Sequence, residues 1–161
     1  MLQPAPPDTL LDDGRQSPAA LAVQRGVRRL FARMQAASVT ELVLASGRRA
    51  DVVVLGRGGE IAIIEIKSSV ADFRADRKWQ SYRAYCDRFY FAVPEAFPAA
   101  LIPEDAGLIL ADGFDAAILR EPPAHPLAGA RRKAMTLRFA HAAAGALLAI
   151  SDPAARLPDA F

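Results

Sequence analysis

The chain has 161 residues, of which 52% are hydrophobic and 24% charged, and its formal net charge is +2. This composition is that of an ordinary globular protein with one core, and it excludes a polycationic tail. The single cysteine, Cys86, excludes an internal disulfide and favours a reducing cytosol. Because the first residues also lack the pattern of a secretory signal, we expect a cytoplasmic protein.

The N-terminal part predicts a flexible segment followed by a helix. Residues 1–16 are rich in Pro and Asp without a hydrophobic period, and residues 17–161 are expected to form a single domain. Ser17 followed by Pro18 is typical of a helix start, and apolar residues at helical spacing continue to about residue 36. The arginines of this helix form either a solvated surface or a contact with phosphate groups. They are Arg25, Arg28, Arg29 and Arg33.

Three apolar runs come next, and they predict an antiparallel meander of strands. The runs cover residues 40–45, 51–55 and 60–67, and short turns separate them. The second turn, at residues 56–59, contains three glycines, which permit the positive φ angles of a hairpin. The second run is apolar on both faces, which is typical of a strand covered on both sides.

The second half of the chain predicts a mixed α/β arrangement. A helix is expected from residue 68 to about residue 86, and the aromatic-rich strand at 87–93 follows it. A helical crossover links parallel strands, so this strand is expected to pair parallel to an earlier one. Short strands at 107–111 and 116–120 come next.

A long helix at 131–150 ends the predicted domain. This C-terminal stretch is apolar, but Arg138 and His141 interrupt it. We therefore expect it to be too short and too broken for a membrane span.

Three charged residues occupy positions where a core strand is normally apolar. Asp51 opens the second run, and Glu65 and Lys67 close the third. Residues two apart on a strand share a face and lie roughly 7 Å apart, so Glu65 and Lys67 are expected to point the same way. The hairpin register can bring Asp51 alongside them. Buried charges need partners, which indicates either a functional site or an ordinary surface ion pair.

Two carboxylates and a lysine suit a metal-assisted reaction at a phosphate. Mg²⁺ or Mn²⁺ prefers oxygen ligands, which Asp51, Glu65 and the main-chain carbonyl of Ile66 can supply. Lys67 could orient an attacking water and offset negative charge in the transition state. The sequence has no Cys/His cluster, which excludes a zinc site of the usual kind.

The order of these residues resembles the PD-(D/E)XK nuclease superfamily. Asp51 is followed, after a hairpin, by Glu65-Ile66-Lys67 and then by a helix and a strand. The longer run from Arg48 to Pro94 resembles the MmcB family of bacterial DNA-repair proteins. This resemblance implies an α/β, restriction-endonuclease-like αβββαβ core with a mixed central sheet. To that core the chain adds C-terminal strands and a long C-terminal helix.

The resemblance also implies roles for individual residues. Asp51 and Glu65 would be ligands of Mg²⁺ or Mn²⁺, and Lys67 would be the catalytic lysine. Ala50 stands where the motif name places a proline. Glu41 is a further acidic candidate, with an ordinary exposed residue as the alternative.

Five residues around the motif are candidate DNA contacts through phosphate groups or bound water. They are Arg49, Arg74, Arg77, Lys78 and Tyr82. Lys78 and Tyr82 are four apart and would share one face of a helix, although a solvated lysine and a half-buried tyrosine are the alternative.

We therefore hypothesise a metal-dependent DNA endonuclease or processing nuclease in DNA repair, located in the cytoplasm and at the bacterial nucleoid. The alternative is a non-catalytic DNA-binding or scaffolding module of the same fold, acting with a repair partner. A third possibility is a subunit that is active only with another protein. No membrane partner is expected. The sequence leaves open the DNA structure or lesion, DNA against RNA, the number of metal ions and the oligomeric state.

Overall fold

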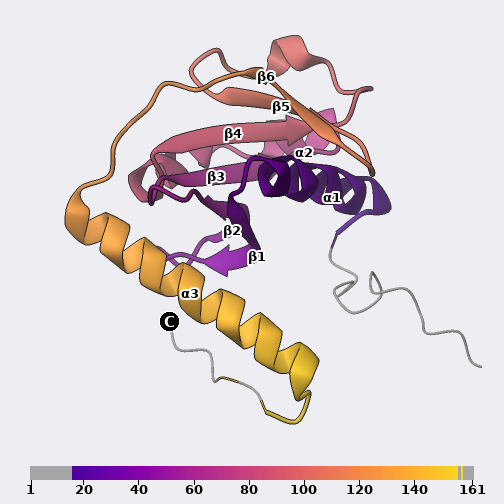
Figure 1. Ribbon diagram of the computed structural model, residues 1–161. Helices are drawn as coiled ribbons and strands as arrows, with labels where there is room; N and C mark the ends of the chain where they lie inside the picture. The colour runs from indigo at the N-terminus through magenta and orange to yellow at the C-terminus, as the bar shows by residue number, and fades with distance from the viewer. Residues whose placement is uncertain (1–15, 156, 158–161) are drawn as a thin grey trace, which may run out of the picture.

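The computed structural model, which describes residues 16–155 and 157, contains a six-stranded mixed sheet (Figure 1). The strands lie side by side in chain order, antiparallel except where β4 pairs with β3 and with β5. Their bounds are β1 Ala37–Val43, β2 Arg49–Leu55, β3 Ile61–Ile66, β4 Arg88–Val93, β5 Gly107–Ala111 and β6 Ala116–Arg120. The antiparallel meander and the parallel pairing of the aromatic strand are thereby confirmed.

Helix α1 (Pro18–Arg33) covers one face of the sheet. Ser17 caps it, because its hydroxyl accepts a hydrogen bond from Ala20 N at 3.1 Å, and a proline occupies the first turn. The buried side of α1 packs on Val52 and Ile64 of the central strands. The predicted first helix and its start are confirmed.

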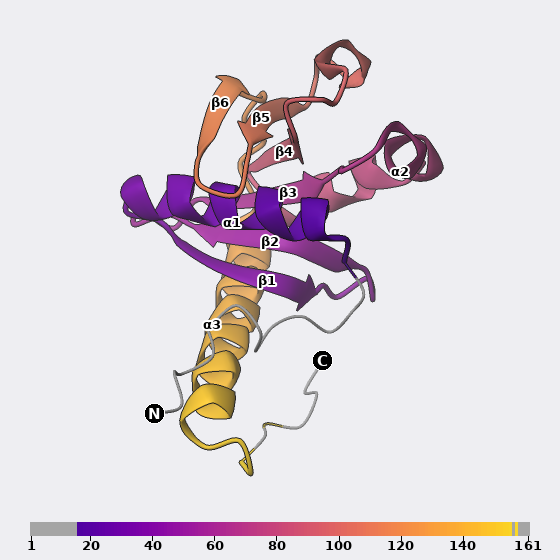
Figure 2. The same cartoon turned by 90° about the vertical axis from the view of Figure 1, so that its right-hand side faces the viewer.

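The opposite face is covered by η2 (Trp79–Tyr85) and by α3 (Gly129–Ser151), as Figure 2 shows for α1 and α3 on the two sides of the sheet. Met135 and Phe139 are the buried residues of α3. Two short elements, α2 (Val70–Ala75) and η3 (Ala99–Leu101), complete the described helices. Every residue of β3 is buried, so this strand is central to both layers.

Of the described helices, α3 alone has the length and apolar composition that a membrane span requires. Its 23 residues correct the expectation that the stretch is too short. Length and composition do not by themselves establish a span, because core helices of soluble proteins can share them.

The second predicted helix is broken in the structure, which corrects the expectation of one helix over residues 68–86. It consists of α2 and the 3₁₀ segment η2, with residues 76–78 between them. Asp76 accepts a hydrogen bond from Lys78 N at 3.1 Å, and such local bonds compete with helix formation. After the break, Trp79 stacks on Phe89 of β4 with ring centroids 5.3 Å apart.

One buried carboxylate ties three parts of the fold together. Asp87, just before β4, accepts hydrogen bonds from Ile61 N and Leu127 N, both at 2.8 Å. The Arg132 guanidinium donates to its two oxygens at 2.6 and 2.7 Å. Burial opposes ionisation of this carboxyl, but Arg132 and the two main-chain N–H groups outweigh it and lower its pKa to about 2. The start of β3, the loop before α3 and the first turn of α3 therefore meet at Asp87.

We predict that Asp87→Asn lowers the free energy of unfolding by about 2 kcal/mol at pH 7. The folded carboxyl has a lowered pKa, so its contribution is present above the unfolded value of 3.8 and is lost as the pH falls towards 2. Urea unfolding of both proteins from pH 7 to pH 2 measures the difference. Asp105, an exposed acid paired with Arg83, gives the control Asp105→Asn, for which we expect a change within about 0.5 kcal/mol. A difference between wild type and Asp87→Asn that does not vary with pH would contradict the explanation.

Candidate active site

The register of the central hairpin places Asp51 opposite Glu65. The β2–β3 ladder runs from the pair Leu55–Ile61 to the pair Val52–Ile64, and one further step reaches Asp51 and Glu65. The regular ladder ends there. The sequence-based expectation that the hairpin brings the two carboxylates together is confirmed.

Side chains replace the ladder hydrogen bonds at this point. Asp51 N donates to Glu65 Oε1 at 3.1 Å, and Ile66 N donates to Asp51 Oδ2 at 2.8 Å. Each carboxylate therefore binds the main chain of the other strand. This reciprocal arrangement fixes both acids, and no cation of the described residues forms an ion pair with either of them.

The strand geometry at Asp51 is irregular. Ala50 packs in the layer of α3 and Val52 in the layer of α1, although residues two apart normally share a face. In the adjacent strand, the pairs Thr40–Val52 and Leu42–Ala50 place Glu41 opposite Asp51, and Glu41 has a φ of 57°. Left-handed backbone at a non-glycine residue costs about 1–3 kcal/mol and is frequent at functional sites. No signal in the sequence indicated this irregularity.

Burial disfavours the ionised form of both carboxyls. Glu65 is only 5% exposed. Its burial, together with the charge of Asp51, raises its pKa from 4.5 to about 8. Burial also raises the pKa of Asp51; the hydrogen bond from Ile66 opposes this rise and the charge of Glu41 adds to it. The pair is thus short of positive charge.

The donor set fits a hard divalent cation. In the part of the chain that the structure describes, Asp51 Oδ1 and Glu65 Oε2 accept no hydrogen bond. Two carboxylate oxygens that repel each other are ligands suited to Mg²⁺ or Mn²⁺. The described residues contain no metal-binding group of three or more His, Cys, Asp or Glu. An ion here would therefore take its other ligands from main-chain oxygen, water or substrate, and a ligand role of the Ile66 carbonyl stays a prediction.

Lys67 is buried, and it follows Ile61, Ile63 and Glu65 at the two-residue spacing of one strand face. Ile61 and Ile63 pack in the α3 layer, so this face of the sheet is the one that α3 covers. Its side-chain nitrogen donates to Asp76 Oδ2 at 2.9 Å. The lysine is therefore paired with an acid that we did not single out from the sequence. The signal available there was a polar triplet, residues 76–78, inside an otherwise amphipathic helical pattern.

The Glu41 side chain binds residues outside the Asp51–Glu65 pair. One of its carboxylate oxygens lies 2.5 Å from Arg49 Nε, and the other accepts a hydrogen bond from Gln16. Its negative charge also acts on the site, because it raises the pKa of Asp51.

The candidate DNA contacts divide into exposed and buried residues. Arg49, Arg74, Arg77 and Lys78 are exposed. Tyr82 is only 3% exposed, and its hydroxyl donates to the Arg49 carbonyl at 3.0 Å. The ring therefore belongs to the core beside the site, which corrects the expectation that Tyr82 faces DNA. Its burial results from η2, whose 3₁₀ geometry does not keep residues 78 and 82 on one face.

An open pocket of about 490 Å³ lies over the break between α2 and η2. Arg77 and Lys78 line it beside Asp76. Arg48 also lines it and lies with its guanidinium 4.5 Å from the Tyr82 ring centre. Arg48 is thus a further cation near the site, which we had not included among the candidates.

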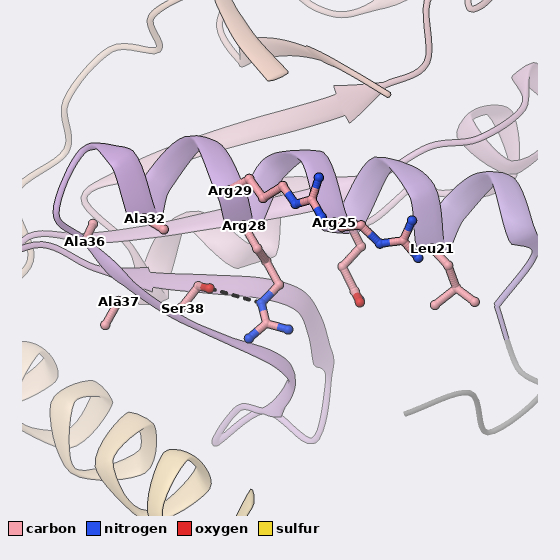
Figure 3. Close-up of a pocket in the computed structure, with 9 residues that line it drawn as sticks. Leu21, Arg25, Arg28, Arg29, Ala32, Ala36, Ala37 and Ser38 are labelled. Carbon is pink, nitrogen blue, oxygen red and sulfur yellow. Dashed lines mark hydrogen bonds between the residues drawn. The ribbon is translucent and has the colours of Figure 1, made fainter. Parts of the chain in front are cut away.

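A second groove, of about 480 Å³, runs along α1 (Figure 3). Arg25, Arg28 and Arg29 line it, and Arg28 Nε donates to Ser38 Oγ of β1 at 3.2 Å. Because α1 packs on the face opposite to Glu65 and Lys67, this groove is separate from the carboxylate pair.

These features define a mixed α/β domain with an Asp–Glu–Lys site at the ends of its central strands. The chain belongs to the MmcB-like family of DNA-repair proteins, whose model it matches over residues 7–154. The predicted resemblance to the MmcB family is thereby confirmed, and this family membership supports a role in DNA repair.

Among solved structures, the SPO1766 protein of unknown function from Silicibacter pomeroyi is similar, with 45% sequence identity and a TM-score of 0.85. The match covers 89% of this chain and 99% of that chain. The comparison with curated proteins gives no match.

The raised pKa of Glu65 predicts a pH dependence of stability. The folded carboxyl holds its proton where the unfolded one has lost it, so this group lowers stability as the pH rises from about 4.5 to about 8. Glu65→Gln keeps the Oε1 acceptor for Asp51 N and removes the charge. We expect this variant to be more stable than wild type at pH 8 by at least about 1 kcal/mol, roughly one pKa unit.

Denaturant unfolding from pH 5 to pH 8.5 with a metal chelator tests this expectation. Glu104→Gln is the control, because Glu104 is exposed and takes part in none of the described hydrogen bonds or ion pairs. If wild type and Glu65→Gln change in parallel over this range, the buried charge of Glu65 is not the cause.

Proposed function

We propose that this protein is a metal-dependent DNA nuclease of the PD-(D/E)XK, restriction-endonuclease-like type, acting in DNA repair. The observation that carries the proposal is the pair of carboxylates formed by the half-buried Asp51 and the buried Glu65, which accept hydrogen bonds from Ile66 N and Asp51 N beside the buried Lys67. The described order of helices and strands from α1 to β4 agrees with the αβββαβ core. Membership of a DNA-repair family supports DNA as the substrate.

Each residue of the site would have a separate task. Asp51 and Glu65 would hold Mg²⁺ or Mn²⁺, which when bound lowers the pKa of a ligated water and stabilises charge on phosphate oxygens. The hydrogen bonds from Ile66 N and Asp51 N orient the two carboxylates before any substrate arrives. Lys67 presents a positive charge on the Glu65 face, where it would offset negative charge developing on the phosphoryl group.

The exposed cations near the site would bind the DNA backbone. Arg77 and Lys78 line the pocket over the helix break, and Arg74 and Arg49 are exposed nearby in the sequence. Contacts of this kind are made to phosphate groups, so they position the DNA without reading its sequence.

A non-catalytic DNA-binding module, acting with a repair partner, is the second candidate. It is favoured by one observation, that the described residues offer no third acidic ligand beside Asp51 and Glu65. The same fold and cationic surface would then serve binding alone.

Nicking of supercoiled and branched DNA with Mg²⁺ or Mn²⁺ separates the two candidates. We expect wild type to cleave, and Glu65→Gln and Lys67→Ala each to lose about 100-fold or more in rate while still binding DNA. Lys133→Ala is the matched control, since Lys133 is an exposed lysine of α3, and should keep full activity. Equal background cleavage by wild type and both site variants, with DNA binding intact, would instead establish the binding module.

A further inference from the structure

The break between α2 and η2 places an acid next to the buried lysine of the site. Asp76 Oδ2 lies 2.9 Å from Lys67 Nζ, and the two side chains are 12% and 7% exposed. An ion pair at this depth is screened little by solvent. It therefore has more influence on the position of the ammonium than a surface pair would.

Asp76 is itself held from a second side. Its Oδ1 accepts a hydrogen bond from Lys78 N at 3.1 Å, and an Arg48 nitrogen lies 3.8 Å away. Burial disfavours the charged carboxylate, but the bonds from Lys67 and Lys78 N outweigh burial and lower the pKa of Asp76. The carboxylate is thus ionised and fixed at neutral pH.

Without Asp76, the lysine would have other acidic neighbours. Glu65 is two residues away on the same strand face, and Asp51 is bonded to the same strand end. A lysine side chain is a flexible four-carbon stem, and its ammonium can donate hydrogen bonds in several directions. Without Asp76, the ammonium would therefore turn to the nearest available carboxylate. An ammonium placed between Asp51 and Glu65 would occupy the oxygens that a divalent cation needs.

We propose that Asp76 is a positioning residue that holds the Lys67 ammonium away from the Asp51–Glu65 pair and so keeps both carboxylates open for a cation. The inference rests on the proposed nuclease function. It explains why the second helix is interrupted at Asp76, since a continuous helix over residues 76–78 would not let Asp76 bond both Lys67 and Lys78 N.

The first test reads the position of Lys67 in the metal-free protein. The ¹H–¹⁵N spectrum of lysine side chains shows an ammonium only when a hydrogen bond protects it from exchange. We expect a protected Lys67 signal in wild type, a shifted or lost signal in Asp76→Asn, and recovery in Asp76→Glu. Asp72→Asn is the matched control, because Asp72 lines the same pocket but does not contact Lys67. An unchanged Lys67 signal in Asp76→Asn would overturn the positioning role.

The second test measures Mn²⁺ affinity and cleavage. Asp76→Asn should bind Mn²⁺ about 10-fold more weakly and lose about 10-fold in kcat with KM for DNA unchanged, while the exposed-site control Glu104→Gln stays near wild type. In a Lys67→Ala background, Asp76→Asn should cause no further loss of Mn²⁺ affinity, since no ammonium is left to misplace. Full Mn²⁺ affinity in Asp76→Asn would refute the inference. Absence of metal-dependent cleavage by wild type, with the Lys67 signal still dependent on Asp76, would refute the proposed function and leave the positioning role standing.

Discussion

The exchange of hydrogen bonds between Asp51 and β3 is the constraint on which the site depends. A central sheet normally satisfies its N–H groups through the ladder, and an unpaired buried group is costly. Here the ladder stops and two side-chain carboxylates accept the bonds that main-chain carbonyls would otherwise accept. The sheet therefore tolerates two acids at its centre because they complete its hydrogen bonding.

Two buried acids of this domain differ in whether their surroundings favour or disfavour the ionised carboxylate. Asp87 is surrounded by donors, with Arg132 and two main-chain N–H groups, and its charge stabilises the fold. Glu65 has a single main-chain donor and a like charge beside it, so its ionised form is disfavoured. Asp87, which stabilises the fold, and Glu65, which belongs to the candidate site, thus differ in the number of hydrogen-bond donors around each carboxylate. Of these two acids, Glu65 is the one whose charge a bound cation would stabilise.

The sequence was most informative where a short-range rule operates. Period-two alternation predicted the two faces of β3, and the short glycine turn predicted that Asp51 meets Glu65. The partner of Lys67 could not be predicted, because Asp76 lies in a helical pattern whose interruption depends on a tertiary ion pair. Tyr82 is buried more deeply than the half-buried alternative predicted, because helical spacing does not describe a 3₁₀ segment. Neither composition nor residue spacing predicts the left-handed backbone conformation of Glu41.

Residues 76–78 include both exposed cations and the acid that binds the buried Lys67. The first residue of this segment binds the buried lysine, its last two are exposed cations, and the main-chain N–H of Lys78 donates to the Asp76 carboxylate. In the proposed function, DNA phosphates bound by Arg77 and Lys78 would act on the segment whose first residue, Asp76, holds the Lys67 ammonium. DNA binding at the surface and the position of the buried ammonium would then be coupled through three consecutive residues.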